Sequence, residues 1–91
     1  MAEGLVKDGM NAFSLQEEAL PLLKGSDRRK IAIATAIKEQ TTVSQGWIAA
    51  RLKMKSGANV SQQVRRYQLG EIQLEDEQRE WLETVKNCDP F

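Results

Sequence analysis

Apolar residues recur three to four positions apart along most of the chain, which is the spacing of helices that bury one face. The clearest example covers about residues 27–40, where Ile31, Ile33, Ala34 and Ile37 form a packing face. Small residues on that face allow a neighbouring helix to approach closely. The β-branched isoleucines leave a strand as the alternative, but so long a stretch without a turn signal favours a helix.

An earlier helix is predicted at Ser14-Leu-Gln-Glu17, which has the sequence of a capping box. In this motif the serine accepts from the third helical amide while the glutamate reaches back to the cap. Pro21 does not fit beyond the first turn, so this helix is short or broken there. We expect Gly25 to end it, and Ser26 or Asp27 to cap the helix that follows.

Three further helices follow in the second half of the chain. The third covers about residues 44–53 and starts at Thr42 or Ser44. The fourth covers about 57–69, with Ser56 as its N-cap and Gly70 as a left-handed C-terminal cap. The fifth covers about 74–86 and carries its apolar residues on one side: Leu74, Trp81, Leu82 and Val85.

These patterns predict an all-α protein, a compact bundle of about five short helices. With 91 residues the chain is expected to form a single helical domain over 1–91, ending in an acidic helix and tail over 70–91. Trp47 is expected to anchor the core, because Ile48 and Leu52 share its helix, and Trp81 is expected to lie in the core or at an interface.

Composition excludes several kinds of chemistry. The sequence has no histidine and one cysteine, Cys88, so it cannot supply a histidine zinc site, a Ser-His-Asp triad or a disulfide of its own. We therefore expect no metal, no cofactor and no catalysis. The start has no apolar signal-peptide region, and no apolar stretch approaches the roughly 20 residues that span a bilayer. These features predict a cytoplasmic protein without membrane contact.

The net charge is zero, but the charges are segregated along the chain. Residues 24–66 hold ten basic and two acidic side chains, a net charge of +8, whereas residues 1–23 carry −3 and residues 67–91 carry −5. A basic middle between acidic flanks is the distribution expected of a unit that binds a polyanion. The alternative is that these charges only solvate exposed helix faces.

The third and fourth helices form a candidate helix-turn-helix over about residues 43–68. Ala49 is the small residue that lets the two helices cross, and Met54 is the apolar residue that fills the turn. If Val60, Val64 and Tyr67 are the buried stripe of the fourth helix, its opposite side is left for a DNA groove. The alternative is an ordinary helical hairpin whose polar face meets only water.

The predicted DNA contacts fall into two sets. Short polar residues and an arginine on the outer side of the fourth helix suit base reading in a major groove: Ala58, Asn59, Ser61, Gln62 and Arg65. Cations around the turn and at the start of the second helix, with one helix-capping serine, suit phosphate contacts: Arg28, Arg29, Lys30, Arg51, Lys53, Lys55, Ser56 and Arg66.

Several of these residues occur in runs that resemble a known protein family. The most distinctive runs are Thr41-Thr42-Val43-Ser44, Trp47-Ile48-Ala49, Leu52-x-Met54 and Val60-Ser61. They resemble the C-terminal helix-turn-helix tail of REP-associated tyrosine transposases, bacterial proteins that join such a tail to a nuclease acting on single-stranded DNA. The resemblance implies a DNA-binding regulator, remnant or fragment.

This chain departs from that family in ways that bear on activity. The nuclease needs a His-hydrophobe-His metal site and a catalytic tyrosine, whereas this chain has no histidine and its single tyrosine, Tyr67, falls in the fourth helix. Lys53 and Lys55 stand where the motif often has glycine or a small residue. The resemblance does not extend to residues 69–91.

Two alternatives concern partners. The acidic helix over 74–86 either packs back on the domain or pairs with a second copy, giving a homodimer on paired half-sites. The predicted function is sequence-preferring binding of DNA, most simply double-stranded. The main rival is a protein-interaction module, such as an adaptor or an antitoxin-like partner, that uses the acidic helix.

Overall fold

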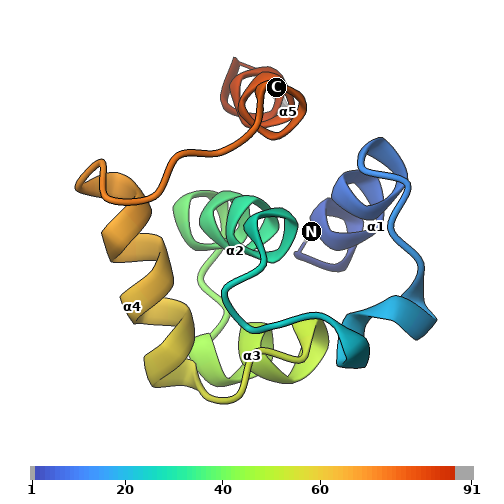
Figure 1. Cartoon of the computed structure of the whole chain (residues 1–91), viewed down its shortest axis with the longest axis vertical. Coiled ribbons are helices and arrows are strands. Elements are labelled where there is room, and N and C mark those ends of the chain that lie inside the picture. The colour runs from blue at the N-terminus through green and yellow to red at the C-terminus, as the bar shows by residue number, and fades with distance from the viewer. Residues whose placement is uncertain (1, 88–91) are drawn as a thin grey trace.

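The computed structural model describes residues 2–87 of the chain (Figure 1). Within that range all regular structure is helical, which confirms the all-α prediction. Cys88 and the rest of the predicted tail lie outside the described residues. The elements in chain order are α1 (Ala2–Ala12), the short 3-10 helix η1 (Glu17–Leu22), α2 (Arg28–Gln40), α3 (Gln45–Leu52), α4 (Gly57–Gln68) and α5 (Asp76–Asn87).

Helix α2 lies at the centre, and α1, α3, α4 and α5 all pack against it (Figure 1). Every residue from 31 to 37 is buried, so the helix has no solvent face along its middle. The one hydroxyl in this stretch is satisfied locally, because Thr35 Oγ1 donates to the Ile31 carbonyl at 2.7 Å. The sequence pattern predicted that one face of this helix is buried. In the structure the surrounding helices bury all of its faces over residues 31–37.

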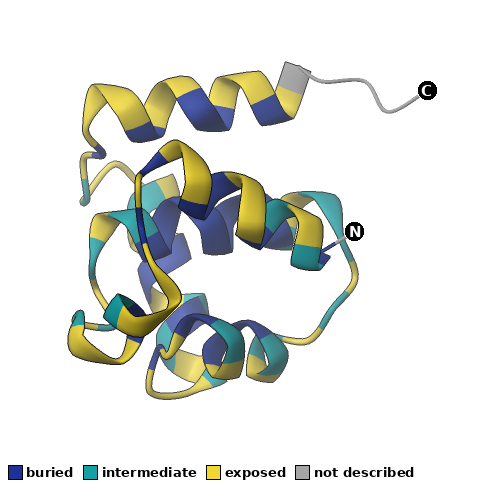
Figure 2. Ribbon diagram, turned by 90° about the vertical axis from the view of Figure 1, so that its right-hand side faces the viewer, coloured by how far each residue is buried: buried dark blue, intermediate teal, exposed yellow. Residues whose placement is uncertain are grey.

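Helix α5 packs back on the domain, which decides between the two alternatives for its apolar face. Leu82 and Val85 are buried on its inner side, and its outer side faces solvent (Figure 2). The Trp81 ring meets Phe13 edge-on with centroids 5.4 Å apart, and its Nε1 donates to Asp8 Oδ2 at 2.8 Å. Trp81 therefore lies in the core, one of the two positions that the sequence left open for it. The apolar face of α5 is therefore covered by the chain itself in this structure.

Helix α1 was not predicted, and its two glycines explain why. Gly4 and Gly9 lower helix propensity in a segment that also carries charged residues. Gly9 is where α1 crosses its neighbours: an added Cβ would lie 2.7 Å from Ile33 Cγ1 and 3.0 Å from Trp81 Cζ2. The residue that weakens the local helix signal is the one that permits close packing.

The predicted capping box at Ser14 is wrong. Ser14 has a left-handed backbone (φ 52°) and ends α1, with the Leu15 amide donating to the Met10 carbonyl at 2.8 Å. This is the pattern of a Schellman C-cap, which satisfies carbonyls at the end of a helix. The next element is the 3-10 helix η1, which contains Pro21 and begins at Glu17 without a side-chain cap.

The predicted caps of the later helices are confirmed. Asp27 caps α2 by accepting from the Arg29 amide at 2.9 Å, and Ser44 rather than Thr42 caps α3. Ser56 caps α4, and Gly70 (φ 83°) follows it in the left-handed conformation. None of the helices in residues 2–87 has both the length and the apolar character needed to cross a membrane.

Candidate nucleic-acid interface

Helices α3 and α4 are joined by the turn 53–56, and the turn is closed by backbone geometry. Lys53 adopts a left-handed conformation (φ 58°, ψ 50°), and the Met54 amide donates to the Ala49 carbonyl at 2.9 Å. The Met54 side chain is fully buried under the turn, as predicted for its apolar residue. A left-handed lysine is strained relative to glycine.

The two helices approach each other closely at their N-terminal ends. A Cβ added to Gly57 would be 3.2 Å from the Gly46 amide nitrogen and 3.3 Å from Gln45 Cβ. Ala49, which the sequence assigned to the crossing, is buried. The absence of a side chain at Gly57 thus lets the start of α4 approach the start of α3.

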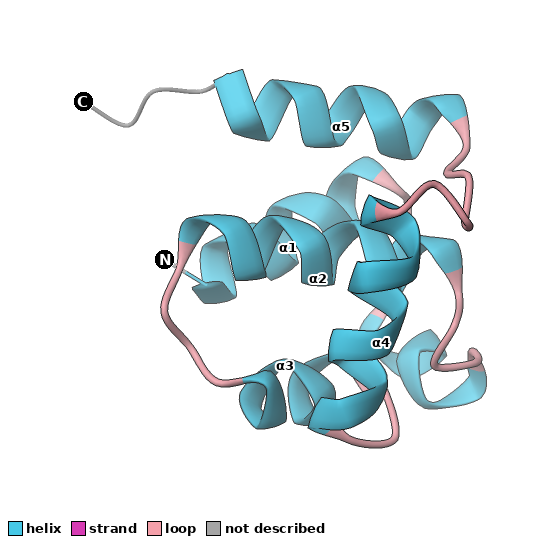
Figure 3. Ribbon diagram, turned by 90° about the vertical axis from the view of Figure 1, so that its left-hand side faces the viewer, coloured by secondary structure: helices cyan, strands magenta, loops and turns pink. Residues whose placement is uncertain are grey.

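The outer side of α4 is open to solvent (Figure 3). Ala58, Gln62 and Arg65 are exposed and Ser61 is half-buried, on the side opposite the buried Val60 and Val64. No acidic residue occurs between positions 40 and 70 of the sequence. Within residues 2–87, Arg65 forms no ion pair. The outer side therefore carries hydrogen-bonding groups and an unneutralised cation.

Asn59, predicted as a base reader, points to a flank of α4 instead. Its Oδ1 accepts from Gln63 Nε2 at 3.3 Å, and its Nδ2 would lie 2.6 Å from a Cβ on Gly25. The side chain is therefore directed at the loop before α2. Gln63 is buried beside it, at 7% exposure, which the sequence pattern did not predict.

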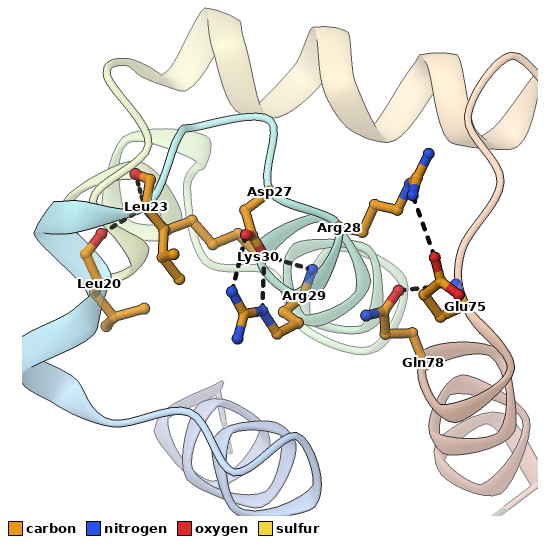
Figure 4. A network of polar contacts seen from close by, with 8 residues as sticks. All are labelled: Leu20, Leu23, Asp27, Arg28, Arg29, Lys30, Glu75 and Gln78. Carbon is orange, nitrogen blue, oxygen red and sulfur yellow. Dashed lines mark hydrogen bonds and ion pairs between the residues drawn. The ribbon is translucent and has the colours of Figure 1, made fainter.

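Lys30, predicted as a phosphate contact, is fully buried. Figure 4 shows its side chain directed at the carbonyl groups of Leu20 and Leu23. Its Nζ donates to the carbonyls of Leu20 at 2.7 Å, Leu23 at 3.0 Å and Lys53 at 3.0 Å. Desolvation lowers the pKa of this ammonium group. The three carbonyls use all three of its donors. Lys30 therefore joins the loop before α2 to the turn between α3 and α4 and presents no charge to a ligand.

Arg51, also predicted as a phosphate contact, is hydrogen-bonded to two carboxylates of the chain itself. Its guanidinium donates to both carboxylate oxygens of Glu3 at 2.8 and 2.7 Å, and to both of Glu17 at 2.9 and 2.6 Å. These hydrogen bonds raise the pKa of Arg51, and the bonds from Arg51 lower the pKa of Glu3. Arg51 therefore ties α3 to α1 and η1, with its charge neutralised by residues far away in sequence.

The remaining predicted cations differ in how firmly they are paired. Arg29 is half-buried on Asp27, whereas Arg28 reaches Glu75 at 3.3 Å and Arg66 reaches Glu71 at 3.6 Å. The last two pairs are solvent-exposed, and exposed ion pairs contribute only about 0–1 kcal/mol. An incoming phosphate can therefore compete for Arg28 and Arg66 more readily than for Arg29.

Lys53, Lys55 and Ser56 lie where the sequence placed them, around the exposed turn. Neither lysine forms an ion pair within the described residues. Ser56 Oγ accepts from the Asn59 amide at 3.2 Å, so its lone pairs are partly used by the cap. Together with Arg28 and Arg66 they are the surface part of the predicted phosphate set.

No family model, curated protein or solved structure matches this chain. Within residues 2–87, no three side chains among His, Cys, Asp and Glu gather into a group that could hold a metal ion. The candidate interface is therefore defined by the side chains on α4 and around the turn.

Proposed function

We propose that the chain is a non-catalytic cytoplasmic protein that binds double-stranded DNA through its helix-turn-helix. The observation that carries the proposal is the outer side of α4, where Gln62 and Arg65 are exposed on a helix without acidic residues. A helix presented in this way by a two-helix turn has the shape that a major groove accepts. The resemblance to the tail of REP-associated tyrosine transposases supports the same function.

Each outer residue has a defined chemical role in the proposal. Gln62 donates to and accepts from an adenine edge, and Arg65 donates to guanine O6 and N7. Ala58 contacts a thymine methyl group, and Ser61 reaches either base edges or the sugar-phosphate from its half-buried position. Asn59 is not retained as a base reader, because its amide is directed at Gly25.

Phosphate contacts come from Lys53, Lys55, Arg28 and Arg66, without Lys30 and Arg51. About four neutralised phosphates give a slope of log affinity against log salt of about −3 to −4. Because α5 already buries its apolar face, one copy on one site is the proposed complex. A pair of copies on adjacent half-sites would have to meet through other surfaces.

The test is a gel-shift selection from random duplex DNA, followed by affinity measurements on the selected site. Replacing Gln62 or Arg65 with Ala is expected to cost about 1–3 kcal/mol on that site and much less on random DNA. The matched controls are Gln68→Ala, on the same helix, and Arg79→Ala, on α5. Equal losses in the controls, or a flat salt response, would overturn the proposal.

The same experiment separates the rival function. A protein-interaction module that uses α5 would show no salt-dependent affinity for duplex or hairpin DNA. Its partner would instead recognise the exposed acidic side of that helix, which includes Glu77, Glu80 and Glu83. Selection of a single-stranded hairpin over every duplex would replace the duplex target with a structured single strand.

A further inference from the structure

The loop before α2 lies along one flank of α4 and forms a cleft with it. The cleft has a volume of about 360 Å³ and is lined by Lys24, Gly25, Ser26, Lys55, Asn59 and Gln63. A second depression continues along the same flank and shares Ser26 and Gln63 with the first. Neither Lys24 nor Ser26 was among the residues predicted to contact DNA.

Lys30 holds the two sides of this cleft together. Its buried ammonium group binds the carbonyls of Leu20 and Leu23 on one side and that of Lys53 on the other. Figure 4 shows it reaching the loop that leads to Lys24. Since every donor of the ammonium group is used, the loop and the turn are held in one arrangement, with Lys24 and Lys55 both lining the cleft.

The cleft contains a buried amide group whose hydrogen bonding is incomplete. Gln63 is 7% exposed, and its Oε1 has no hydrogen-bond partner among the described residues. Amide oxygen and nitrogen are assigned from their partners. Turning the Asn59 and Gln63 amides together keeps their mutual bond and leaves Gln63 Nε2 as the atom without a partner. A buried polar atom left unpaired in a native protein calls for an explanation, such as a ligand.

The charges around the cleft favour an anion. Lys24 and Lys55 line the first depression, which has no acidic residue, and within residues 2–87 neither forms an ion pair. The second depression adds Arg28 and Arg66, together with Glu71, which pairs with Arg66 at 3.6 Å. The part nearest the turn is therefore the more positive.

We propose that this cleft binds phosphate groups of the DNA strand that runs along the flank of α4, with Lys24, Ser26 and Lys55 on its rim. In this proposal the Gln63 amide is turned so that Nε2 takes the place of the unpaired Oε1 and donates from the floor of the cleft. The inference rests on the proposed function. It adds a set of phosphate contacts along the flank of α4 to the contacts proposed for the outer side of that helix. At 1.5 Å per residue, the helical stretch from Gly57 to Arg66 is about 14 Å long, which matches several consecutive phosphates better than one ion.

The first experiment measures duplex affinity by fluorescence anisotropy between 50 and 200 mM salt. Lys24→Gln and Lys55→Gln are each expected to reduce the salt slope by about 1 and to weaken selected and random duplexes by the same factor. The control is Lys7→Gln, an exposed lysine on α1 outside the cleft. Lys55 belongs to both proposals, so Lys24→Gln is the variant that tests the cleft alone. A slope unchanged in Lys24→Gln, with the wild-type chain binding DNA, would overturn the cleft and leave the proposed function standing.

The second experiment follows the side-chain amide of Gln63 by NMR. Adding duplex DNA is expected to shift its NH₂ resonances, and Gln63→Leu is expected to weaken duplex binding several-fold while the chain stays folded. Resonances that do not move, or full affinity in Gln63→Leu, would remove Gln63 from the site. Inorganic phosphate is titrated separately. If inorganic phosphate moves these resonances and the duplex does not, the cleft binds an anion, and the proposed contact with the DNA strand is wrong.

A wild-type chain that binds no duplex at any salt concentration would overturn the proposed function and this inference together. That result differs from the failure of the cleft alone, in which the wild type binds and the cleft variants behave like Lys7→Gln.

Discussion

Helices α4 and α5 are a natural comparison, because both are twelve residues long and both pack one side on α2. Each also buries one glutamine. Gln78 of α5 accepts from the Glu75 amide at 3.0 Å and so caps its own helix, whereas Gln63 of α4 leaves Oε1 without a partner in the described part of the chain. The burial of Gln78 is explained by the cap that it forms on its own helix. Within residues 2–87, no local hydrogen bond explains the burial of the Gln63 amide oxygen.

The outer sides of the two helices differ more strongly still. The outer side of α4 carries Gln62 and Arg65, and that of α5 carries Glu77, Glu80 and Glu83. An amphipathic pattern decides only which side of a helix is buried. The charge on the other side decides which partner it attracts, and a polyanion is attracted to α4 and repelled by α5.

The largest expected effect concerns the packing of α5. Trp81→Ala removes a buried ring that contacts Phe13 and donates to Asp8, and we expect a loss of about 3–5 kcal/mol in the free energy of unfolding. Urea denaturation measures it, with Trp47→Ala as the control. Trp47 is only half-buried on α3, so its loss should be clearly smaller. Equal losses would contradict α5 as part of the core.

The second prediction compares the two glutamines directly. Gln78→Leu removes the acceptor for the Glu75 amide and is expected to cost about 1 kcal/mol, the usual value for a lost cap. Gln63→Leu exchanges an incompletely bonded amide for an apolar group and is expected to leave the stability within about 0.5 kcal/mol. Thermal or urea unfolding of both variants checks this. A larger loss in Gln63→Leu would show that this amide is structural.

The third prediction concerns the turn that presents α4. Lys53→Gly relieves a left-handed backbone and is expected to raise the free energy of unfolding by up to about 1 kcal/mol. Lys55→Gly is the matched control, because the backbone of Lys55 is not left-handed and glycine should bring no gain there. A gain of the same size in both variants would mean that conformational strain at Lys53 is not the cause.

The smallest expected effect depends on acid. Hydrogen bonds from Arg51 lower the pKa of Glu3 below its ordinary value of 4.5. The folded protein therefore binds fewer protons than the unfolded chain, and the associated stability is present above pH 4.5 and lost as pH falls through the folded pKa. Because Glu3 is partly exposed, we expect only a few tenths of a kcal/mol. In Arg51→Gln this part of the pH dependence of urea unfolding should disappear, and its persistence would assign it to other carboxyl groups.

Much of the fold could be predicted because it depends on residues near one another in sequence. The bounds of α2, α3 and α4 agree with expectation to within one or two residues, since Asp27, Ser44 and Ser56 satisfy amides two or three positions ahead. Helix α1 could not be predicted, because Gly9 is favourable only where the side chains of Ile33 and Trp81 approach it.

In the candidate site too, some features follow from neighbouring residues in the sequence and others depend on distant segments. The exposure of Gln62 and Arg65 follows from the 3.6-residue period once Val60 and Val64 are buried. The burial of Lys30 does not, because its three acceptors come from a loop and a turn that lie apart in the sequence. The neutralisation of Arg51 by Glu3 and Glu17 is likewise a contact between distant segments.

The order of residues alone determined that this chain is helical, where its later helices begin, and which side of α4 is polar, because caps and periodicity act over a few residues. Only the tertiary structure decided which cations stay at the surface and that the loop at Ser26 meets Gln63 across a cleft. A side chain's charge can be read from the sequence, but its neutralisation or burial depends on distant segments that folding brings beside it.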